Sequence, residues 1–394
     1  MAHGAGPVRR AYKFRIYPTT GQAARAALCL RDHQRLYNAA LEERREAWTR
    51  QRVSINYGSQ SGQLKDIRRA DPEEQGRWSF SSQQATLRRL DKAMAAFYRR
   101  CQAGQKAGYP RFKALDRWDS VEWPSDGDGC RWKPGIGRVY LQGVGHVQVH
   151  AHRAVAGRVK TISLKREGRR WYVVLSCDDV PPRPLPATGR EVGVDVGVTR
   201  FATTSDGEII PSPRFARESA AELAAAQQAL ARKKRRSANR RRARAKVAAV
   251  HRRIRHRRAD FCHKTARALV QTCDVIALED LRIPNMTRSA RGTLDRPGTN
   301  VAAKSGLNRS ILDAGWGQFA GILAAKAEEA GRRVVFVNPA YSSIDCHQCG
   351  ARCTRPRQDT VICPAHGAMH ADVNGAINVY ARAGLGPGQA APAT

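Results

Sequence analysis

The sequence predicts an α/β protein in two parts: an N-terminal β-module with inserted helices, and a C-terminal half in which strands alternate with helices. The C-terminal part is predicted from two apolar, strand-like runs, residues 273–281 and 331–340. A stretch long enough for helices separates them, which is the pattern of an α/β domain. The N-terminal part is predicted because short alternating runs occur at 11–18 and again within 118–180. With 394 residues, the chain is long enough for two or three domains, each with its own core.

The chain begins with a short strand followed by helices. Residues 11–18 alternate apolar and basic side chains and end at a proline, which is typical of a strand and a turn. Residues 22–101 place apolar residues at three- and four-residue spacing, which predicts amphipathic helices with basic outer faces. We expect Ser81 and Ser82 to act as N-caps. The predicted domains are a small β-barrel module of residues 1–20 and 105–180, and a helical domain of residues 21–104.

The later strands of the β-module follow a segment rich in glycine and proline. The runs 137–150, 160–168 and 170–177 have the alternation of half-buried strands. Residues 181–190 are rich in proline and are predicted to be a linker.

The C-terminal half is predicted to form one α/β domain over residues 191–382. Alternating apolar residues and an Asp-Gly pair at 206 and 207 favour three successive antiparallel strands at its start. Residues 383–394, rich in glycine, proline and alanine, are predicted to be a flexible tail.

The charge balance of the chain points to a polyanionic partner. Lysine and arginine number 69 against 34 acidic residues, which gives a formal charge of +35 and a pI near 10.8. The sequence has no apolar run long enough to cross a membrane and no apolar signal segment at its start, so we expect a cytoplasmic protein. In a reducing compartment, clustered cysteines favour metal binding over disulfides.

The strongest basic segment is residues 232–258, which contain fifteen lysines and arginines and no acid. Such a run is explained poorly as a solvated helix, because like charges repel one another, and a phosphate backbone would neutralise them. The segment is poor in aromatic residues, which favours contact with a duplex backbone over base stacking. The predicted nucleic-acid contacts are Arg232, Lys233, Lys234, Arg235, Arg236, Arg240, Arg241 and Arg242.

Three acids are candidates for catalysis: Asp195, Glu279 and Asp372, each at an apolar element. A carboxylate in a half-buried strand is costly unless it is paired or bound to a cation. Such acids can share one or two Mg²⁺ ions that stabilise a phosphoryl displacement. A capped or ion-paired structural role is the ordinary alternative for each of them. Gly193 and Gly197 flank Asp195 and would let a phosphate backbone come close.

A second cluster has the spacing of a structural zinc ribbon. Two C-x-x-C/H pairs, each followed by glycine, supply four ligands for a closed tetrahedral site: Cys346, Cys349, Cys363 and His366. The fourth ligand is the least determined, and the nearby alternatives are His347, Cys353 and His370.

The zinc segment could be a base-reading finger or a clamp. A finger needs an exposed helix after its ligands. Here the segment leads to Asp372 and then to a helix whose Val373, Ile377 and Tyr380 we expect to be buried. We therefore expect a clamp that holds the loop carrying Asp372.

Several of these motifs, in this order, resemble the TnpB family, the OrfB-type insertion-sequence transposases ancestral to compact type V CRISPR nucleases. The resemblance rests on "AYKFRIYPTTGQ", "LYNAALEERR", "GYPRFKAL", "VGVDVGVTRFATTSDG", "ALEDLRIPNM" and the zinc segment with "ADVNGAINVY". It spans most of the chain.

The resemblance implies a RuvC-like nuclease domain of RNase H fold, with a zinc ribbon inserted at 345–369. Asp195, Glu279 and Asp372 match the family's three catalytic acids, which hold magnesium. It further implies that the protein binds a guide RNA from the element and recognises a short flanking DNA motif. DNA would then be cut to leave 3′-hydroxyl and 5′-phosphate ends.

Two departures from the family pattern stand out. The second zinc pair ends in His366 where the family usually has cysteine, and His370 and Ala371 precede Asp372 where Asp-Arg is common. The last acid is thus kept while its neighbours differ. A transposase that joins DNA strands, and a regulator that binds nucleic acid without cutting it, are the competing interpretations.

Overall fold

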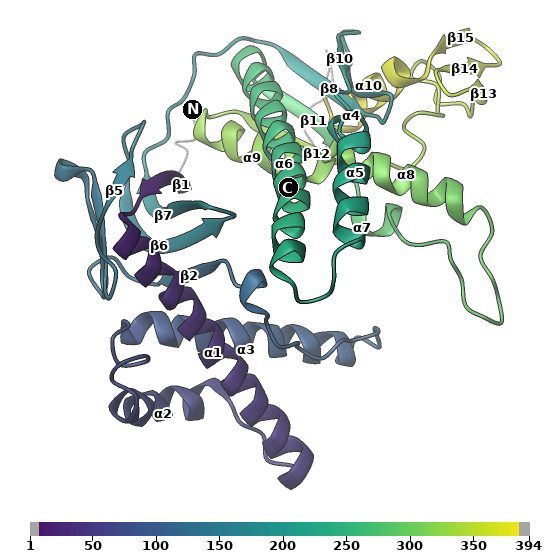
Figure 1. Cartoon of the computed structure of the whole chain (residues 1–394). Coiled ribbons are helices and arrows are strands. Elements are labelled where there is room, and N and C mark those ends of the chain that lie inside the picture. The colour runs from purple at the N-terminus through teal and green to yellow at the C-terminus, as the bar shows by residue number, and fades with distance from the viewer. Residues whose placement is uncertain (1–7, 386–394) are drawn as a thin grey trace. The chain divides into compact units, whose positions relative to one another are not determined.

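The computed structural model describes residues 8–385, and these form two compact units (Figure 1). The first unit runs to Pro181 and the second begins at Pro182. The predicted tail at 383–394 lies outside the described residues apart from 383–385, of which Leu385 is buried.

The first unit contains a strongly curved, antiparallel sheet of seven strands in the order β2-β6-β7-β1-β5-β4-β3. The strand at 8–17 pairs with two strands that lie more than a hundred residues later, which explains why the sequence splits the β-module. The strands are β1 (Val8–Tyr17), β2 (Ser120–Trp123), β3 (Cys130–Lys133), β4 (Arg138–Leu141), β5 (Gly145–His150), β6 (Arg158–Glu167) and β7 (Arg170–Val180).

Three helices lie between β1 and β2: α1 (Thr20–Gln51), α2 (Tyr57–Ala70) and α3 (Phe80–Gln102). Thr19 begins α1 with a capping box to Gln22. The predicted caps of α3 are wrong by two to three residues. Ser79 is the N-cap and accepts from the backbone N–H of Ser82, because the helix starts at Phe80.

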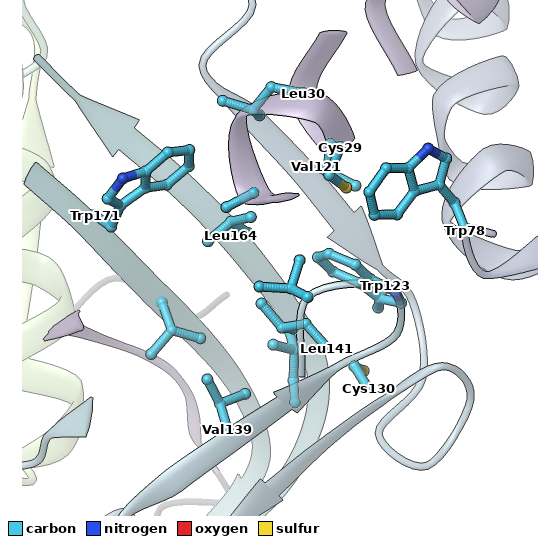
Figure 2. Close-up of a cluster of buried hydrophobic side chains, with 14 of the residues drawn as sticks. Cys29, Leu30, Trp78, Val121, Trp123, Cys130, Val139, Leu141, Leu164 and Trp171 are labelled. Carbon is cyan, nitrogen blue, oxygen red and sulfur yellow. The ribbon is translucent and has the colours of Figure 1, made fainter. Parts of the chain in front are cut away.

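The helices and the sheet of this unit share one hydrophobic core. Leu30 of α1 and Trp78 before α3 belong to the same buried cluster as Trp123, Leu141 and Leu164 from the strands (Figure 2). The helical segment therefore depends on the sheet for its burial.

The second unit is built on a five-stranded sheet in the order β10-β9-β8-β11-β12. The first three strands are antiparallel in succession, as predicted, and β11 and β12 then run parallel to β8. Their bounds are β8 (Glu191–Val196), β9 (Arg200–Thr204), β10 (Ile209–Pro211), β11 (Val275–Glu279) and β12 (Arg333–Val337).

Helices cover both faces of this sheet. Its helices are α4 (Phe215–Glu218), α5 (Ala220–Ala231), α6 (Ala238–Thr272), α7 (Ile283–Met286), α8 (Val301–Ala314), α9 (Trp316–Glu329) and α10 (Ala371–Arg382). Leu269 of α6 and Leu323 of α9 pack with Ile276 on one face, and Val379 of α10 packs with Ala277 on the other.

Between β12 and α10 lies a small three-stranded sheet of β13 (Thr354–Arg357), β14 (Thr360–Cys363) and β15 (Gly367–His370). We call residues 342–370 the ribbon. β15 ends where α10 begins, so the ribbon leads directly into the helix that carries Asp372.

The segment predicted as a linker is fixed to the second unit. The backbone N–H of Arg183 donates to Glu329 at 2.7 Å, and the N–H groups of Thr188 and Gly189 donate to the carboxylate of Asp274 at 2.7 to 3.0 Å.

Candidate functional site

The register of the central strands places Asp195 and Glu279 on one face of the sheet. Val194 of β8 is the partner of Leu278 in parallel β11, and both lie in the core beneath α6 and α9. The next residue on each strand points to the opposite face, because side chains alternate along a strand. The two acids therefore lie side by side on the face that α10 covers.

Gly193 allows α10 to approach β8 closely. A Cβ atom at this position would lie 2.2 Å from the carbonyl oxygen of Ala376 and 2.6 Å from the backbone nitrogen of Tyr380. The expectation that a phosphate backbone approaches Gly193 is therefore wrong, because the backbone of α10 already fills the space beside it. Gly197 lines the cavity that contains Asp195, so for this glycine the expectation stays a prediction.

α10 brings the third acid to the same place. Asp372 lies in the first turn of the helix, and one turn later Gly375 packs directly on Asp195. A Cβ at Gly375 would lie 3.2 Å from Oδ2 of Asp195 and 3.3 Å from its Cγ. The structure thus brings together all three acids predicted from the sequence, and all three line one cavity.

The electrostatics of Asp195 show how closely the three carboxylates are placed. Burial raises its pKa well above the ordinary value, and the negative charges of Glu279 and Asp372 raise it further. Arg355 acts in the opposite direction without compensating for these effects. A carboxylate in such surroundings is stabilised in its charged form by a bound cation.

Glu279 has a hydroxyl partner that the sequence did not reveal. Burial raises its pKa, while the hydroxyl of Ser342, which donates to Oε1, and the charge of Arg382 oppose that rise. Ser342 is itself buried and is the first residue of the ribbon. It therefore fixes the orientation of the carboxylate.

Asp372 is held by a guanidinium and by its own helix terminus. Nη1 of Arg200 in β9 donates to Oδ2 of Asp372 at 3.1 Å and also contacts Nε2 of His370. Nδ1 of His370 accepts from the backbone N–H groups of Asp372 and Val373 at 3.2 and 3.4 Å. His370 is therefore the N-cap of α10.

The three acids lie in a cavity of about 810 Å³ that is also lined by a fourth acid, Asp280, by apolar residues such as Phe336, and by positive and polar groups. Arg282 follows β11 and α7 adds Asn285, while Arg355 and Gln358 come from the ribbon. Acids on one side and guanidinium groups on another suit a phosphodiester that is held against bound cations.

The donor set of this cavity fits a hard divalent cation. Carboxylate oxygens from three separate elements converge, and the burial that raises the pKa of Asp195 and Glu279 leaves their charge incompletely balanced. Mg²⁺ prefers a few carboxylates together with waters and phosphate oxygens. The residues present therefore match that ion in number and chemistry.

The predicted zinc ligands converge in the ribbon. Ligand atoms of Cys346, Cys349, Cys363 and His366 all lie within 4.8 Å of one another. The Cys349 and Cys363 sulfurs are 3.6 Å apart, and Nδ1 of His366 is 3.6 Å from the sulfurs of Cys346 and Cys363. A tetrahedron with Zn–S bonds of 2.3 Å has an edge of about 3.8 Å. The cluster therefore fits a tetrahedral metal ion.

Two of the three alternative ligands are engaged elsewhere, and the third, Cys353, lies beside Cys346 and Cys363. His347 contacts Oδ1 of Asn374 through its backbone N–H and its Nδ1, at 2.9 and 3.0 Å. His370 caps α10. Cys353 is packed in the small core of the ribbon with Val361. None of the three belongs to the four-residue group.

Two asparagines that sequence reasoning missed join the ribbon to α10. Nδ2 of Asn374 donates to the carbonyl of Asp345 at 2.8 Å. Nδ2 of Asn378 donates to the carbonyls of Ser342 and Asp345 at 2.8 and 2.7 Å. Both side chains are buried. Two asparagines spaced four apart on an otherwise apolar helix were the available signal.

The buried face of α10 differs from the prediction. Val373, Ile377 and Tyr380 are only half-buried, whereas Asn374 and Val379 are buried with their neighbours 375, 376 and 378. The prediction counted apolar residues, but the helix turns its asparagines inward because the ribbon offers them carbonyl partners.

The basic segment forms the tip of a helical hairpin. Arg232 to Arg236 are exposed in and beside the turn between α5 and α6, which lie side by side (Figure 1). Arg241 and Arg242 are exposed in the first turns of α6. Arg240 differs, because its Nη1 donates to the carbonyls of Leu230 and Lys233 at 3.1 and 3.0 Å and so closes the turn.

Further along α6 three arginines pair with acids of neighbouring elements. The pairs are Arg253 with Glu222, Arg257 with Glu218 and Arg258 with Asp313. The expectation that phosphates balance the charge is therefore wrong for these three arginines.

Comparison with curated proteins identifies the family. The chain is 32% identical to the "Putative RNA-guided DNA endonuclease InsQ" of Escherichia coli (strain K12) over 376 residues, which cover 94% of this chain and 92% of that one. It is 34% identical to a "Putative RNA-guided DNA endonuclease" of Streptomyces pristinaespiralis, over 96% of this chain and 90% of the relative. The chain belongs to the TnpB family.

Three family models cover parts of this TnpB protein. The model described as "Probable transposase" (OrfB_IS605) matches residues 173–290, and the Cas12f1-like TNB domain matches 316–379. The third, described as a helix-turn-helix domain, matches 6–52. Over the described part of that range the structure has β1 and one continuous helix, α1.

The fold of this TnpB protein is shared with a solved structure. It matches a chain of the "Cryo-EM structure of the Cas12f1-sgRNA-target DNA complex" with a TM-score of 0.56 and 12% identity, over 95% of this chain and 98% of that one. At this identity the likeness concerns the fold alone. Within residues 8–385 there is no helix that is both long and apolar enough to span a membrane.

Proposed function

We propose that this TnpB protein is an RNA-guided DNA endonuclease of a mobile element, whose second unit is a RuvC-like nuclease domain of RNase H fold. The observation that carries the proposal is the convergence of Asp195, Glu279 and Asp372 from β8, β11 and α10 on one cavity. Three antiparallel strands followed by two parallel ones, with the first acid on the central strand, support the assignment of the fold.

The three acids would hold Mg²⁺, which supplies charge stabilisation for a phosphoryl displacement and lowers the pKa of bound water. The protein's own residues then position the reactants. Arg355 and Arg282 line the cavity and would bind non-bridging oxygens of the scissile phosphate. Ser342 and Arg200 keep Glu279 and Asp372 oriented toward the cavity. This preorganisation is where such a site gains most of its catalytic power.

Cys346, Cys349, Cys363 and His366 would hold a structural zinc ion. Closed tetrahedral sites of thiolates and imidazole stabilise small folds that have little core of their own. The ribbon has such a small core, and it contributes Arg355 and Gln358 to the catalytic cavity. Cys346, Cys349, Cys363 and His366, with a zinc ion bound, would therefore fix this wall of the cavity.

DNA and a guide RNA from the element are the proposed partners. The exposed cations among the predicted contacts, Arg232 to Arg236 with Arg241 and Arg242, would contact phosphates. Arg240 is assigned to the turn instead. Names of the curated relatives support RNA-guided cleavage as the activity.

The test is to express the protein together with the RNA of its element, purify the complex and add matched DNA with Mg²⁺. We expect double-strand cleavage that Asp195→Ala abolishes. Asp206→Asn is the matched control, because this exposed acid lies at the β9–β10 turn and pairs with Arg190. Cleavage by Asp195→Ala, or activity without RNA, would refute the proposal. Recovery of joined DNA molecules would instead support strand transfer.

A further inference from the structure

The first unit contains a groove that takes no part in the cleavage chemistry. It has a volume of about 950 Å³ and lies between the C-terminal ends of α1 and α3 and the segment 109–112. Aliphatic residues such as Leu41, Val53 and Met94 line it, together with five aromatic side chains: Trp48, Phe97, Tyr98, Tyr109 and Phe112.

These rings are exposed to an extent that is unusual for large apolar side chains. Trp48 is 53% exposed, Tyr98 50% and Phe112 46%. Phe97 fixes the cluster from behind, with its ring centroid 5.3 Å from that of Tyr98 and 5.2 Å from that of Tyr109. The groove therefore offers flat aromatic faces that are already held in place and would lose little conformational entropy on binding.

The charges around the groove restrict what can bind there. Arg44, Arg45 and Arg111 line it, and none of the described lining residues is acidic. Arg44 is buried and paired with Asp91, whereas Arg45 and Arg111 are exposed. Exposed arginines at the rim attract an anionic ligand. An apolar peptide would leave these positive charges unpaired.

Four hydroxyl groups also line the groove. Thr49 and Ser54 line the groove with the two tyrosines. Hydroxyls can both donate to and accept from the 2′-hydroxyl of a ribose, which is the group that distinguishes RNA from DNA.

We propose that this groove binds unpaired nucleotides of RNA, with bases stacked on Trp48 and Tyr98 and phosphates against Arg45 and Arg111. Aromatic faces flanked by arginines are the usual means of holding single strands. A duplex is disfavoured, because its bases are stacked on one another and cannot reach the rings. The groove would complement the tip of the α5–α6 hairpin, which lacks aromatic residues between its cations.

Trp48 supplies a local signal for the test. It is the exposed tryptophan of the seven, while the other six are buried or half-buried, so stacking of a base should quench its fluorescence selectively. The full-length protein, stripped of nucleic acid at high salt, is titrated with a short oligouridylate. We expect quenching that Trp48→Phe removes, and Tyr98→Ala should weaken binding by about five- to a hundredfold.

The salt dependence separates this groove from general charge attraction. Tyr98→Ala should leave the slope of log K against log [salt] unchanged, because no phosphate contact is lost. Arg45→Ala together with Arg111→Ala should reduce that slope. The matched control is Tyr17→Ala, since Tyr17 is 48% exposed in the same unit but does not line the groove.

Three results would overturn the proposal. The first is binding that Tyr98→Ala leaves unchanged while the circular dichroism shows an intact fold. The second is equal quenching by the matching oligodeoxyuridylate, which would contradict the assignment to RNA. The third is self-association that Tyr98→Ala abolishes in the absence of any oligonucleotide, because the groove would then be an interface between copies.

Discussion

Replacing Gly375 should slow cleavage strongly, although this glycine carries no side chain that could act in the chemistry. It lies inside α10, where glycine is normally unfavourable, and a Cβ there would lie 3.2 Å from Oδ2 and 3.3 Å from Cγ of Asp195. It would also lie 3.6 Å from Cα of Ser343. The substitution Gly375→Ala therefore inserts a methyl group between the helix and the carboxylate.

Gly375→Ala should have two opposing effects on the free energy of unfolding. Alanine should stabilise an exposed helix by about 1 kcal/mol relative to glycine. Here the carboxylate must move by several tenths of an ångström, because the methyl group is backed by the helix. We expect that strain to offset the gain, so the free energy of unfolding should change by no more than about 1 kcal/mol. Cleavage should fall by about ten- to a hundredfold, since misplacement by 1 Å can cost a factor of about 10².

The assay is single-turnover cleavage of matched DNA at saturating Mg²⁺, together with thermal unfolding. Gly321→Ala is the matched control, because this glycine also lies inside a helix, α9, and a Cβ there would meet nothing within 4 Å. It should stabilise the protein without affecting cleavage. If Gly375→Ala cleaves at the parental rate, the close contact with Asp195 does not control the placement of that carboxylate.

Four further substitutions test the sheet, the acid site, the ribbon and the tip of the α5–α6 hairpin. Gly193→Ala should destabilise the fold by about 3 kcal/mol or more in chemical unfolding, because its Cβ would meet helix backbone at 2.2 Å. Asp195→Asn should abolish cleavage yet stabilise the metal-free protein at neutral pH. The pKa of Asp195 in the folded protein is raised above the unfolded value of about 4. The parent should therefore gain stability as the pH falls from the folded pKa to the unfolded pKa, and the variant should lack that gain. Cys346→Ser should lose zinc by metal analysis and reduce cleavage, whereas Cys353→Ser should keep the metal. Arg235→Glu should lower DNA affinity and flatten its salt dependence in anisotropy titrations.

The sequence was sufficient to single out the three acids that line one cavity and three of the four residues that cluster in the ribbon, while it left the fourth open among His366, His347, Cys353 and His370. Strand alternation carries the information for Asp195 and Glu279, because each follows buried residues whose partners share the opposite face. Fixed spacing does the same for the cysteines. Both signals are local in the chain, and this is why they could be read without coordinates.

The residues that orient the acids were not predictable in the same way. Arg200, Ser342 and Arg355 lie far along the chain from the carboxylates they affect, and a lone arginine or serine has no spacing to recognise it by. The role of Gly193 was misjudged for a related reason. A glycine beside an acid is compatible with a phosphate or with a helix, and only the packing of α10 decides between them.

The coupling between the ribbon and catalysis follows from how α10 is anchored. One face of the helix is fixed to the sheet through Val379 and the close contact at Gly193. Its first turns contact Arg200 of β9 and are also held by Asn374 and Asn378, whose amides donate to carbonyls of the first residues of the ribbon. Loss of the metal should therefore leave the sheet acids in place while it releases the end of the helix that carries Asp372. For this reason a zinc-free protein should remain folded in its second unit and yet bind Mg²⁺ more weakly, a difference that calorimetric titration of the Cys346→Ser variant would detect.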